Sequence, residues 1–331
     1  VRNPGVVEEF LVWYNPNSFD VTLTITAYTG SGSTVVLSPM TVGANKRGGL
    51  EIHNMATLPL GTFAIEILSA PVDSANNDAN IGIVAGLSRY DLVNRFAFGY
   101  LGVRDGGSTT NIITSLTNGT DITSEFTIFN SGSTDATVDI VGSYLEDPGL
   151  PDLVRQVTVG AGERLRLTGT SLAFASNEAI GLRITSDVDV AITAIERQRG
   201  DADATAAFNE AGTSFYFGDA FMNPARAGNL YTETLAFYNP SDADNDVTIT
   251  FFFADGSAER VRMETIAADD FLLLRLEDIS QVVQNRPQLN YYAMRIDATS
   301  GVVVSMTHYD GFLGGGWATG GAPLGLTSSI A

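Results

Sequence analysis

Cysteine is absent from this chain, and lysine is nearly absent, because Lys46 stands alone beside 17 arginines. The lack of cysteine excludes disulfide bonds, a thiol nucleophile and thiolate-bound metals. The 18 basic residues face 38 Asp and Glu, and the formal net charge is −20. Such an acidic chain would repel a phosphate backbone, so nucleic acid is not an expected partner. Long apolar runs are also missing, and no membrane insertion by a helix is expected.

What remains is a composition that forms a core. Hydrophobic residues make up 44% of the 331 residues and charged residues only 17%, which is too apolar for disorder. The 34 glycines do not suit a helical bundle. Segments rich in Val, Ile, Thr, Phe and Tyr alternate on a two-residue period, and turn residues recur between them. This pattern predicts an all-β protein of antiparallel β-sandwiches.

One unit of sequence occurs three times, and a repeat of this length decides how the whole fold is organised. Its first landmark is an aromatic strand that ends at an asparagine, followed by a turn and an aspartate that opens an alternating strand. The asparagines are Asn15, Asn130 and Asn239, and the aspartates are Asp20, Asp135 and Asp246. Two later landmarks recur in the same order, at 42–47, 159–164 and 266–271, and at 89–91, 199–201 and 308–310. Each asparagine side chain is expected to bond the backbone two residues on and to build the hairpin.

The repeat predicts three tandem immunoglobulin-like sandwiches of about seven strands each. Their expected ranges are 1–91, 92–201 and 202–311, followed by a C-terminal segment 312–331. In the third unit the strands are expected near 215–221, 231–238, 246–254, 258–266, 270–276, 290–297 and 301–309. Helix is nearly absent, and a single turn is expected within 276–284.

The phase of the repeat suggests that one strand is displaced. Short aromatic strands at 96–99 and 215–218 are expected to open the second and third units, and 222–224 then matches 2–4. The first unit would therefore lack its first strand. Trp317 to Gly320 aligns with the opening strand of a fourth unit, so the C-terminal segment is expected to supply the missing strand to another copy.

This interpretation predicts a subunit interface made by the two ends of the chain. The expected residues are Trp317, Ala318, Thr319, Leu324, Leu326 and Ile330 on the donor side, and Val1, Val6, Val7 and Phe10 on the acceptor side. The copies could close into a ring, or they could form an extracellular or cell-surface filament, which three sandwiches in a row favour. The C-terminal segment could instead be a flexible glycine-rich linker. A surface adhesin that recognises glycans or calcium, or other surface proteins, is the alternative function.

Catalytic motifs are lacking. The chain has no nucleophile elbow, no zinc-binding HExxH pattern and no phosphate or dinucleotide loop. His53 and His308 are the two histidines, and both are expected to be structural, with His308 at an exposed basic position. The carboxylate pairs Asp187/Asp189 and Asp269/Asp270 fall in expected turns. We therefore expect no enzyme and no required cofactor.

Hard cations suit the oxygen-rich loops of this sequence better than catalysis does. Asp242, Asp244 and Asp246 alternate like the start of a calcium loop, although the glycine and glutamate of a complete loop are missing. A second oxygen-rich loop lies at 73–80. Calcium is thus the candidate ion for these loops.

Taken together, the aromatic strand, the Asn-Pro-Asn or Asn-Pro-Ser turn and the following Val-Thr-Ile-Thr strand resemble uncharacterised repeated immunoglobulin-like β-sandwich domains of bacterial secreted and surface proteins. The resemblance covers all three units. It implies the fold and an exterior location, and it implies no activity. The second unit departs from the pattern with Ser131 in place of proline and an insertion at 103–121.

Overall fold

A computed structural model describes residues 1–30, 32–73, 81–198, 201–222, 231–283, 290–310, 315–320 and 322–323. The described chain is all-β with antiparallel pairing, and it divides into three successive units. None of the helices in these ranges has the length and apolar character needed to cross a bilayer. The predicted all-β, antiparallel fold class is therefore confirmed.

The first unit has two four-stranded sheets. One sheet has the order β5-β1-β7-β8, and in the other β2 pairs with β3 and β4 on one side and with β6 on the other. A 3-10 turn, Ile52–Asn54, follows β5. The strands are β1 (Val7–Tyr14), β2 (Val21–Thr29), β3 (Thr34–Val36), β4 (Met40–Val42), β5 (Arg47–Glu51), β6 (Phe63–Pro71), β7 (Val84–Asp91) and β8 (Phe96–Leu101).

The second unit is organised around one long strand, β14. The first half of β14 pairs with β11 and β9, and the second half pairs with β10 and β15. A 3-10 turn, Arg104–Gly106, precedes β9. The strands are β9 (Ser108–Asn118), β10 (Ile122–Phe129), β11 (Ala136–Tyr144), β12 (Leu153–Val159), β13 (Arg164–Thr168), β14 (Glu178–Gln198) and β15 (Asp201–Ala206).

The third unit repeats this plan with β21 as its long strand. The first half of β21 pairs with β18 and β16, and the second half pairs with β17 and β22. The helical turn expected within 276–284 is present as a 3-10 turn, Leu276–Asp278, and the one-turn helix α1 (Ser280–Val283). The strands are β16 (Gly212–Met222), β17 (Tyr231–Asn239), β18 (Asn245–Phe253), β19 (Arg260–Ile266), β20 (Asp270–Arg275), β21 (Asn290–Asp310), β22 (Gly315–Gly320) and β23 (Ala322–Pro323).

Each unit encloses its own hydrophobic core between two sheets. The alternating strands provide it, as in β2, where Val21, Leu23, Ile25 and Ala27 are buried and the residues between them are not. In units two and three the long strand β14 or β21 contributes one half to each layer. Three immunoglobulin-like sandwiches of about seven strands stay a prediction.

The repeated asparagine anchors the turn in every unit. Asn15 is fully buried, and its side-chain amide donates to the backbone oxygens of Phe19 and Gly43 at 2.9 and 3.0 Å. Its side-chain oxygen accepts from the Asn17 N–H at 3.0 Å, two residues on as expected. Asn130 and Asn239 form the corresponding bonds. A polar side chain therefore holds together the loops that start two strands of each unit.

The observed pairing moves the boundaries between the units. Phe96 to Gly99 belongs to β8, which pairs with β7 and so closes the first unit instead of opening the second. β15 and β22 close the second and third units in the same way. The expected ranges end one strand too early, because the aromatic residues at 96–99 have the same composition as the opening strand at 215–218.

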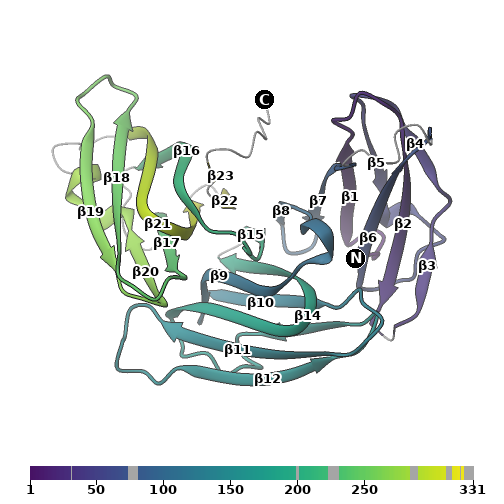
Figure 1. Ribbon diagram of the computed structural model, residues 1–331, viewed down its shortest axis with the longest axis horizontal. Coiled ribbons are helices and arrows are strands. Elements are labelled where there is room, and N and C mark those ends of the chain that lie inside the picture. The colour runs from purple at the N-terminus through teal and green to yellow at the C-terminus, as the bar shows by residue number, and fades with distance from the viewer. Residues whose placement is uncertain are drawn as a thin grey trace.

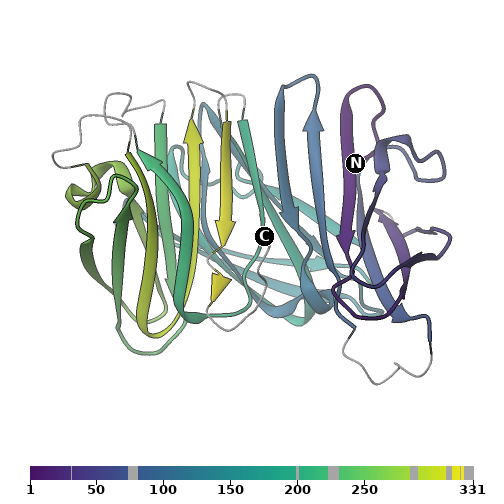
Figure 2. The ribbon, with the colours of Figure 1, turned by 90° about the horizontal axis from the view of Figure 1, so that it is seen from above.

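The three closing strands meet in the middle of the molecule. The first unit lies on one side of the second and the third unit on the other, and β15 contacts both β8 and β22 (Figures 1 and 2). Two junctions between units therefore form side by side at the centre.

Candidate assembly surfaces

The edge of β6 opposite β2, called the β6 edge below, has no strand partner among the described residues. The matching edges of the second and third units are covered by β9 and β16. Ile65 and Ile67 face the core of the first unit but stay half-buried. The residues in the same register of the other units are fully buried: Leu182, Ile184, Met294 and Ile296. Unpaired backbone beside half-buried apolar side chains is the arrangement that accepts an added strand.

In the part of the chain that the structure describes, one backbone pair lies at the end of this edge. Arg2 bridges Gly61 through backbone hydrogen bonds of 2.8 and 2.9 Å. Met222, the last residue of β16, pairs with Asn290 at the same register position of the third unit. Arg2 thus stands where the first strand of the other units ends.

The residues expected on the acceptor side do not form the β6 edge. Val7 begins β1 and is buried in pairing with Asp91, and Val1 and Val6 are half-buried at the chain start. Phe10 lies in β1 and makes an edge contact with His53, with ring centroids 5.2 Å apart. The alternation of apolar residues marked strand β1 correctly, but it could not show that the open edge belongs to β6.

On the donor side, Trp317, Ala318 and Thr319 lie in β22, which pairs with β21 of the same chain. β22 lies on the edge of β21 opposite β17, as β8 lies on the edge of β7 opposite β1. These three residues are therefore held in their own third unit, contrary to expectation. Leu324, Leu326 and Ile330 lie outside the described residues.

The chain leaves the second and third units along the same path. After β15, Phe208 bridges Ile112 of β9, with N–O distances of 2.7 and 2.8 Å. After β22, Ala322 pairs with Tyr216 of β16. Ile112 and Tyr216 occupy the same register position, because they lie opposite Arg183 and Arg295 of the two long strands.

The junction between the first and second units is aromatic and apolar. Phe98 of β8 packs on Ala202 and Ala204 of β15, with Phe96, Tyr100 and Ile195 around it. The guanidinium of Arg197 lies 5.4 Å from the centre of the Phe96 ring, a cation–π contact. Phe129 packs on Tyr28 of the first unit, with ring centroids 4.9 Å apart.

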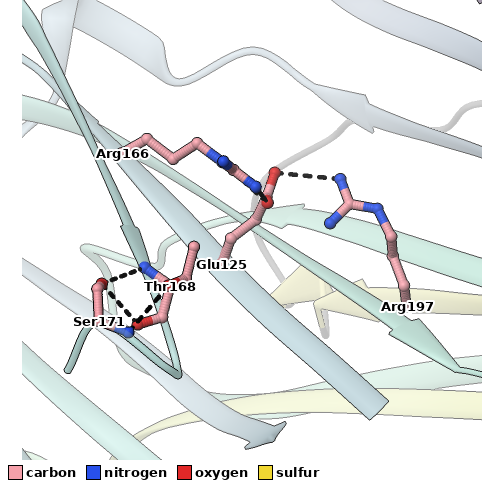
Figure 3. A network of polar contacts seen from close by, with 5 residues as sticks. All are labelled: Glu125, Arg166, Thr168, Ser171 and Arg197. Atoms are coloured by element: carbon pink, nitrogen blue, oxygen red, sulfur yellow. Dashed lines mark hydrogen bonds and ion pairs between the residues drawn. The ribbon is translucent and has the colours of Figure 1, made fainter. Parts of the chain in front are cut away.

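Arg197 also belongs to a charged network that backs this junction. Glu125 is buried and accepts hydrogen bonds from Arg166 and, at 3.1 Å, from the Arg197 Nη2 (Figure 3). Burial works to raise the pKa of Glu125, but the bonds from the two arginines outweigh it and hold the pKa below the ordinary value. Nearby, Thr168 and Ser171 close a turn by mutual hydrogen bonds of 2.8 and 3.0 Å.

The junction between the second and third units is richer in polar groups. Tyr309 of β21 is buried, and its hydroxyl bonds Asp203 of β15 and, at 3.2 Å, Glu196 of β14. Glu196 also accepts from the backbone N–H of Thr117 at 2.5 Å. The Thr114 and Ser305 hydroxyls lie 2.5 Å apart across the junction, and Arg275 forms a 2.6 Å ion pair with Glu146. A small apolar cluster completes it: Ile112, Tyr238 and Val303, with Phe208 and Phe271.

Two carboxyl groups of this junction have strongly raised pKa values. Burial raises the pKa of Glu196 to about 8, and the neighbouring Asp203 adds to the effect. Burial likewise raises the pKa of Asp203 to about 7, with a further contribution from Asp201. These two residues were not predicted, because the sequence alignment placed Arg199 at the position of Arg89 and His308. The strand pairing places Glu196 there instead: Arg89, Glu196 and His308 each pair with the residue that lies six positions before the repeated asparagine.

Both histidines are buried, and His308 is not the exposed basic position that was expected. Its Nδ1 lies 3.2 Å from Glu233 Oε1, and Glu233 also accepts a hydrogen bond from Tyr292. His53 Nδ1 lies 3.1 Å from the backbone N of Glu9. These contacts fix strands at the ends of the sandwiches, in agreement with a structural role for both side chains.

Asp242, Asp244 and Asp246 lie exposed in and after the turn between β17 and β18. Asp246 accepts from the Thr265 hydroxyl at 2.7 Å. Within the described ranges, no three Asp, Glu or His side chains are grouped closely enough to hold a metal ion. The loop at 73–80 lies almost wholly outside those ranges. Calcium therefore stays a prediction without geometric support in this turn.

Comparison with known proteins gives a family match that falls mainly within the third unit. A family model described as Anabaena sensory rhodopsin transducer matches residues 212–313. A structure of Thermotoga maritima 1070 is 22% identical at a TM-score of 0.29, covering 34% of this chain and 95% of its own. The structure of the Anabaena sensory rhodopsin transducer is 19% identical at a TM-score of 0.24, and the match covers 29% of this chain and 96% of the transducer. A chain in a structure of Sulfolobus Turreted Icosahedral Virus is 12% identical at a TM-score of 0.18, and the match covers 89% of this chain and 80% of the viral chain. No curated protein sequence matches.

The family match supports a β-rich domain in the third unit. It covers less than half of the chain. The resemblance to bacterial immunoglobulin-like surface repeats stays a prediction.

Proposed function

We propose that this protein is a non-enzymatic structural subunit that assembles head to tail by strand donation. The segment after β23 of one copy would enter the β6 edge of the next copy. The unpaired β6 edge with half-buried Ile65 and Ile67 carries the proposal, because the other two units bury the same positions under a first strand. An acidic surface with one lysine suits a saline exterior, so we place the assembly outside the cell or at its surface.

The donor follows from the shared path of the chain. Ala322 pairs with Tyr216 as Phe208 pairs with Ile112. Counting on from Phe208, residues 212–217 open β16, and counting on equally from Ala322 reaches residues 326–331. Both stretches contain Thr-Ser, which is followed by Phe215 in the first stretch and by Ser329 and Ile330 in the second. Leu324, Leu326 and Ile330 thus remain the proposed donor residues, whereas residues 315–320 do not.

Deletion of residues 324–331 tests this proposal without touching β22. The full chain should form oligomers whose mass grows with concentration, measured by light scattering after gel filtration, and the deletion should leave a monomer. Exchanging Leu326 and Ile330 for Ser should act like the deletion. Exchanging Ser328 and Ser329 for Ala serves as the matched control and should assemble normally. Unchanged assembly of the deletion variant would overturn the proposal.

A second readout follows the acceptor. Hydrogen exchange of the β6 amides should slow when the full chain assembles, whereas the β3 amides should be unaffected. A peptide of residues 322–331 should slow exchange in β6 of the deletion variant. Exchange in β6 that is equally fast in monomer and oligomer would contradict strand addition at this edge.

A further inference from the structure

Each later unit uses one equivalent face to pack on the unit before it. This face is the outer side of the sheet that contains β10 or β17, and its centre is the aromatic residue just before the repeated asparagine. In the second unit that residue is Phe129, which packs on Tyr28 of the first unit. In the third unit it is Tyr238, which shares an apolar cluster with Ile112 of the second unit. Both aromatic residues are buried, with 9% and 3% of their surface exposed.

The first unit carries the same face uncovered. Tyr14 precedes Asn15 and pairs with Val84 just as Tyr238 pairs with Val303. Tyr14 is 40% exposed and Val84 is 36% exposed. Val12 and Leu101 on the same side are also exposed, and we call these four residues the β1 face. An apolar sheet face that its counterparts bury is expected to pack on another surface.

The third unit carries the complementary surface, also uncovered. Tyr216 occupies the register position of Ile112, which receives Tyr238 inside the molecule. Tyr216 is 50% exposed, whereas Ile112 is 3% exposed. In the neighbouring strand, Trp317 pairs with His308 as Phe98 pairs with Arg89, so it takes the register position of a residue that contacts the following unit.

We infer that the β1 face of one copy packs on the third unit of a second copy around Tyr216, so that the contact between copies repeats the junction between units two and three. This inference rests on the proposed head-to-tail assembly and names its second contact surface. The two surfaces differ and lie in different units. A contact between two copies therefore uses the β1 face of one copy and the Tyr216 surface of the other. The two remaining surfaces can bind further copies, so the assembly grows beyond a dimer.

The absence of cysteine provides a direct test, because an introduced pair of thiols has no competitors. Tyr14→Cys and Tyr216→Cys are prepared separately, mixed and oxidised. The mixture should give a covalent heterodimer, and a Tyr14→Cys/Tyr216→Cys double variant should give a ladder of covalent oligomers. Val154→Cys, exposed on β12 of the second unit, replaces Tyr14→Cys in the matched control and should cross-link at least tenfold less with Tyr216→Cys.

The outcomes separate this inference from strand donation when the test is repeated in the chain lacking residues 324–331. Cross-linking of 14 to 216 that persists at high concentration in that deletion would support the face contact even if strand donation fails. Normal assembly of the full chain with no 14–216 cross-link, or with 14–14 pairs dominating, would overturn the face contact and leave strand donation standing. A full chain that stays monomeric at every concentration would overturn the inference that a second copy packs on the β1 face.

Discussion

The two junctions inside this molecule both involve closing strands, β15 with β8 and β15 with β22, but they differ in chemistry. Between the first and second units, Phe98 packs on two alanines and Arg197 lies over Phe96, backed by the ionised Glu125. Between the second and third units, the position of Phe98 is taken by Asp203, which meets Tyr309. One register position thus accepts an aromatic ring or a carboxyl group, provided that the facing unit supplies a matching partner.

The difference predicts opposite responses to pH. Glu125 has a lowered pKa, so its contribution to stability is present above the ordinary carboxyl range and is lost as pH falls through the folded pKa. Glu196 and Asp203 have raised pKa values, so their folded environment favours the protonated forms. Their contribution is lost as pH rises through about 7 and 8.

The largest effect is expected from removing the aromatic anchor. Phe98→Ala leaves a cavity over Ala202 and Ala204 and should lower the free energy of unfolding by about 3 kcal/mol. Chemical denaturation measures the change. Phe252→Ala, whose ring is 37% exposed on β18, is the control and should cost less than about 1 kcal/mol. Equal losses in the two variants would show that the junction contributes no special stability.

Glu125→Gln should come next. The change leaves Arg197 and Arg166 without their ionised acceptor, and we expect a loss of about 2 kcal/mol at pH 7 that shrinks toward pH 4. Glu264→Gln removes a carboxylate that is more exposed than Glu125 and pairs with Arg262, and it should cost under about 1 kcal/mol. Unfolding curves at several pH values give both numbers, and a Glu125→Gln effect independent of pH would count against this assignment.

Asp203→Asn should reduce the loss of stability at high pH that distinguishes the second junction from the first. The unmodified protein should lose stability between pH 6 and pH 8.5, and the variant should lose less, by on the order of 1 kcal/mol. The pKa of Glu196 should also fall, because its charged neighbour is gone. Thermal unfolding across this pH range measures the first effect and carboxyl NMR shifts the second. Asp139→Asn, exposed on β11, should leave the pH profile unchanged.

The smallest effect is expected at the hydroxyl pair. Thr114→Val leaves the buried Ser305 hydroxyl without its 2.5 Å partner and should cost about 1 kcal/mol. Thr114→Val with Ser305→Ala should recover part of the loss, since neither polar group is then stranded. A double-mutant cycle by denaturation decides this, and strictly additive losses would show that the two hydroxyls do not interact.

Part of the candidate site was visible in the sequence. The Asn-turn repeat located the three units, and the match of 2–4 with 222–224 aligned Arg2 with Met222 at the end of β16. The acceptor residues were misplaced because periodicity finds strands but not their edges: Val7 and Phe10 lie in β1, whereas the open edge belongs to β6. The donor was misplaced because the residues around Trp317 have the composition of an opening strand. Their pairing with β21 makes them the closing strand of the third unit.

The sequence by itself determined the all-β class, the number of repeats and the buried asparagine turns, because these depend on local chemistry repeated three times. Only the tertiary structure decided which edge stays unpaired and which acids meet Tyr309. Strand neighbours and burial depend on contacts far apart in the chain. The strand pairing differs from the sequence alignment by three residues in β14, and Glu196 therefore lies at the junction position that the alignment gave to Arg199.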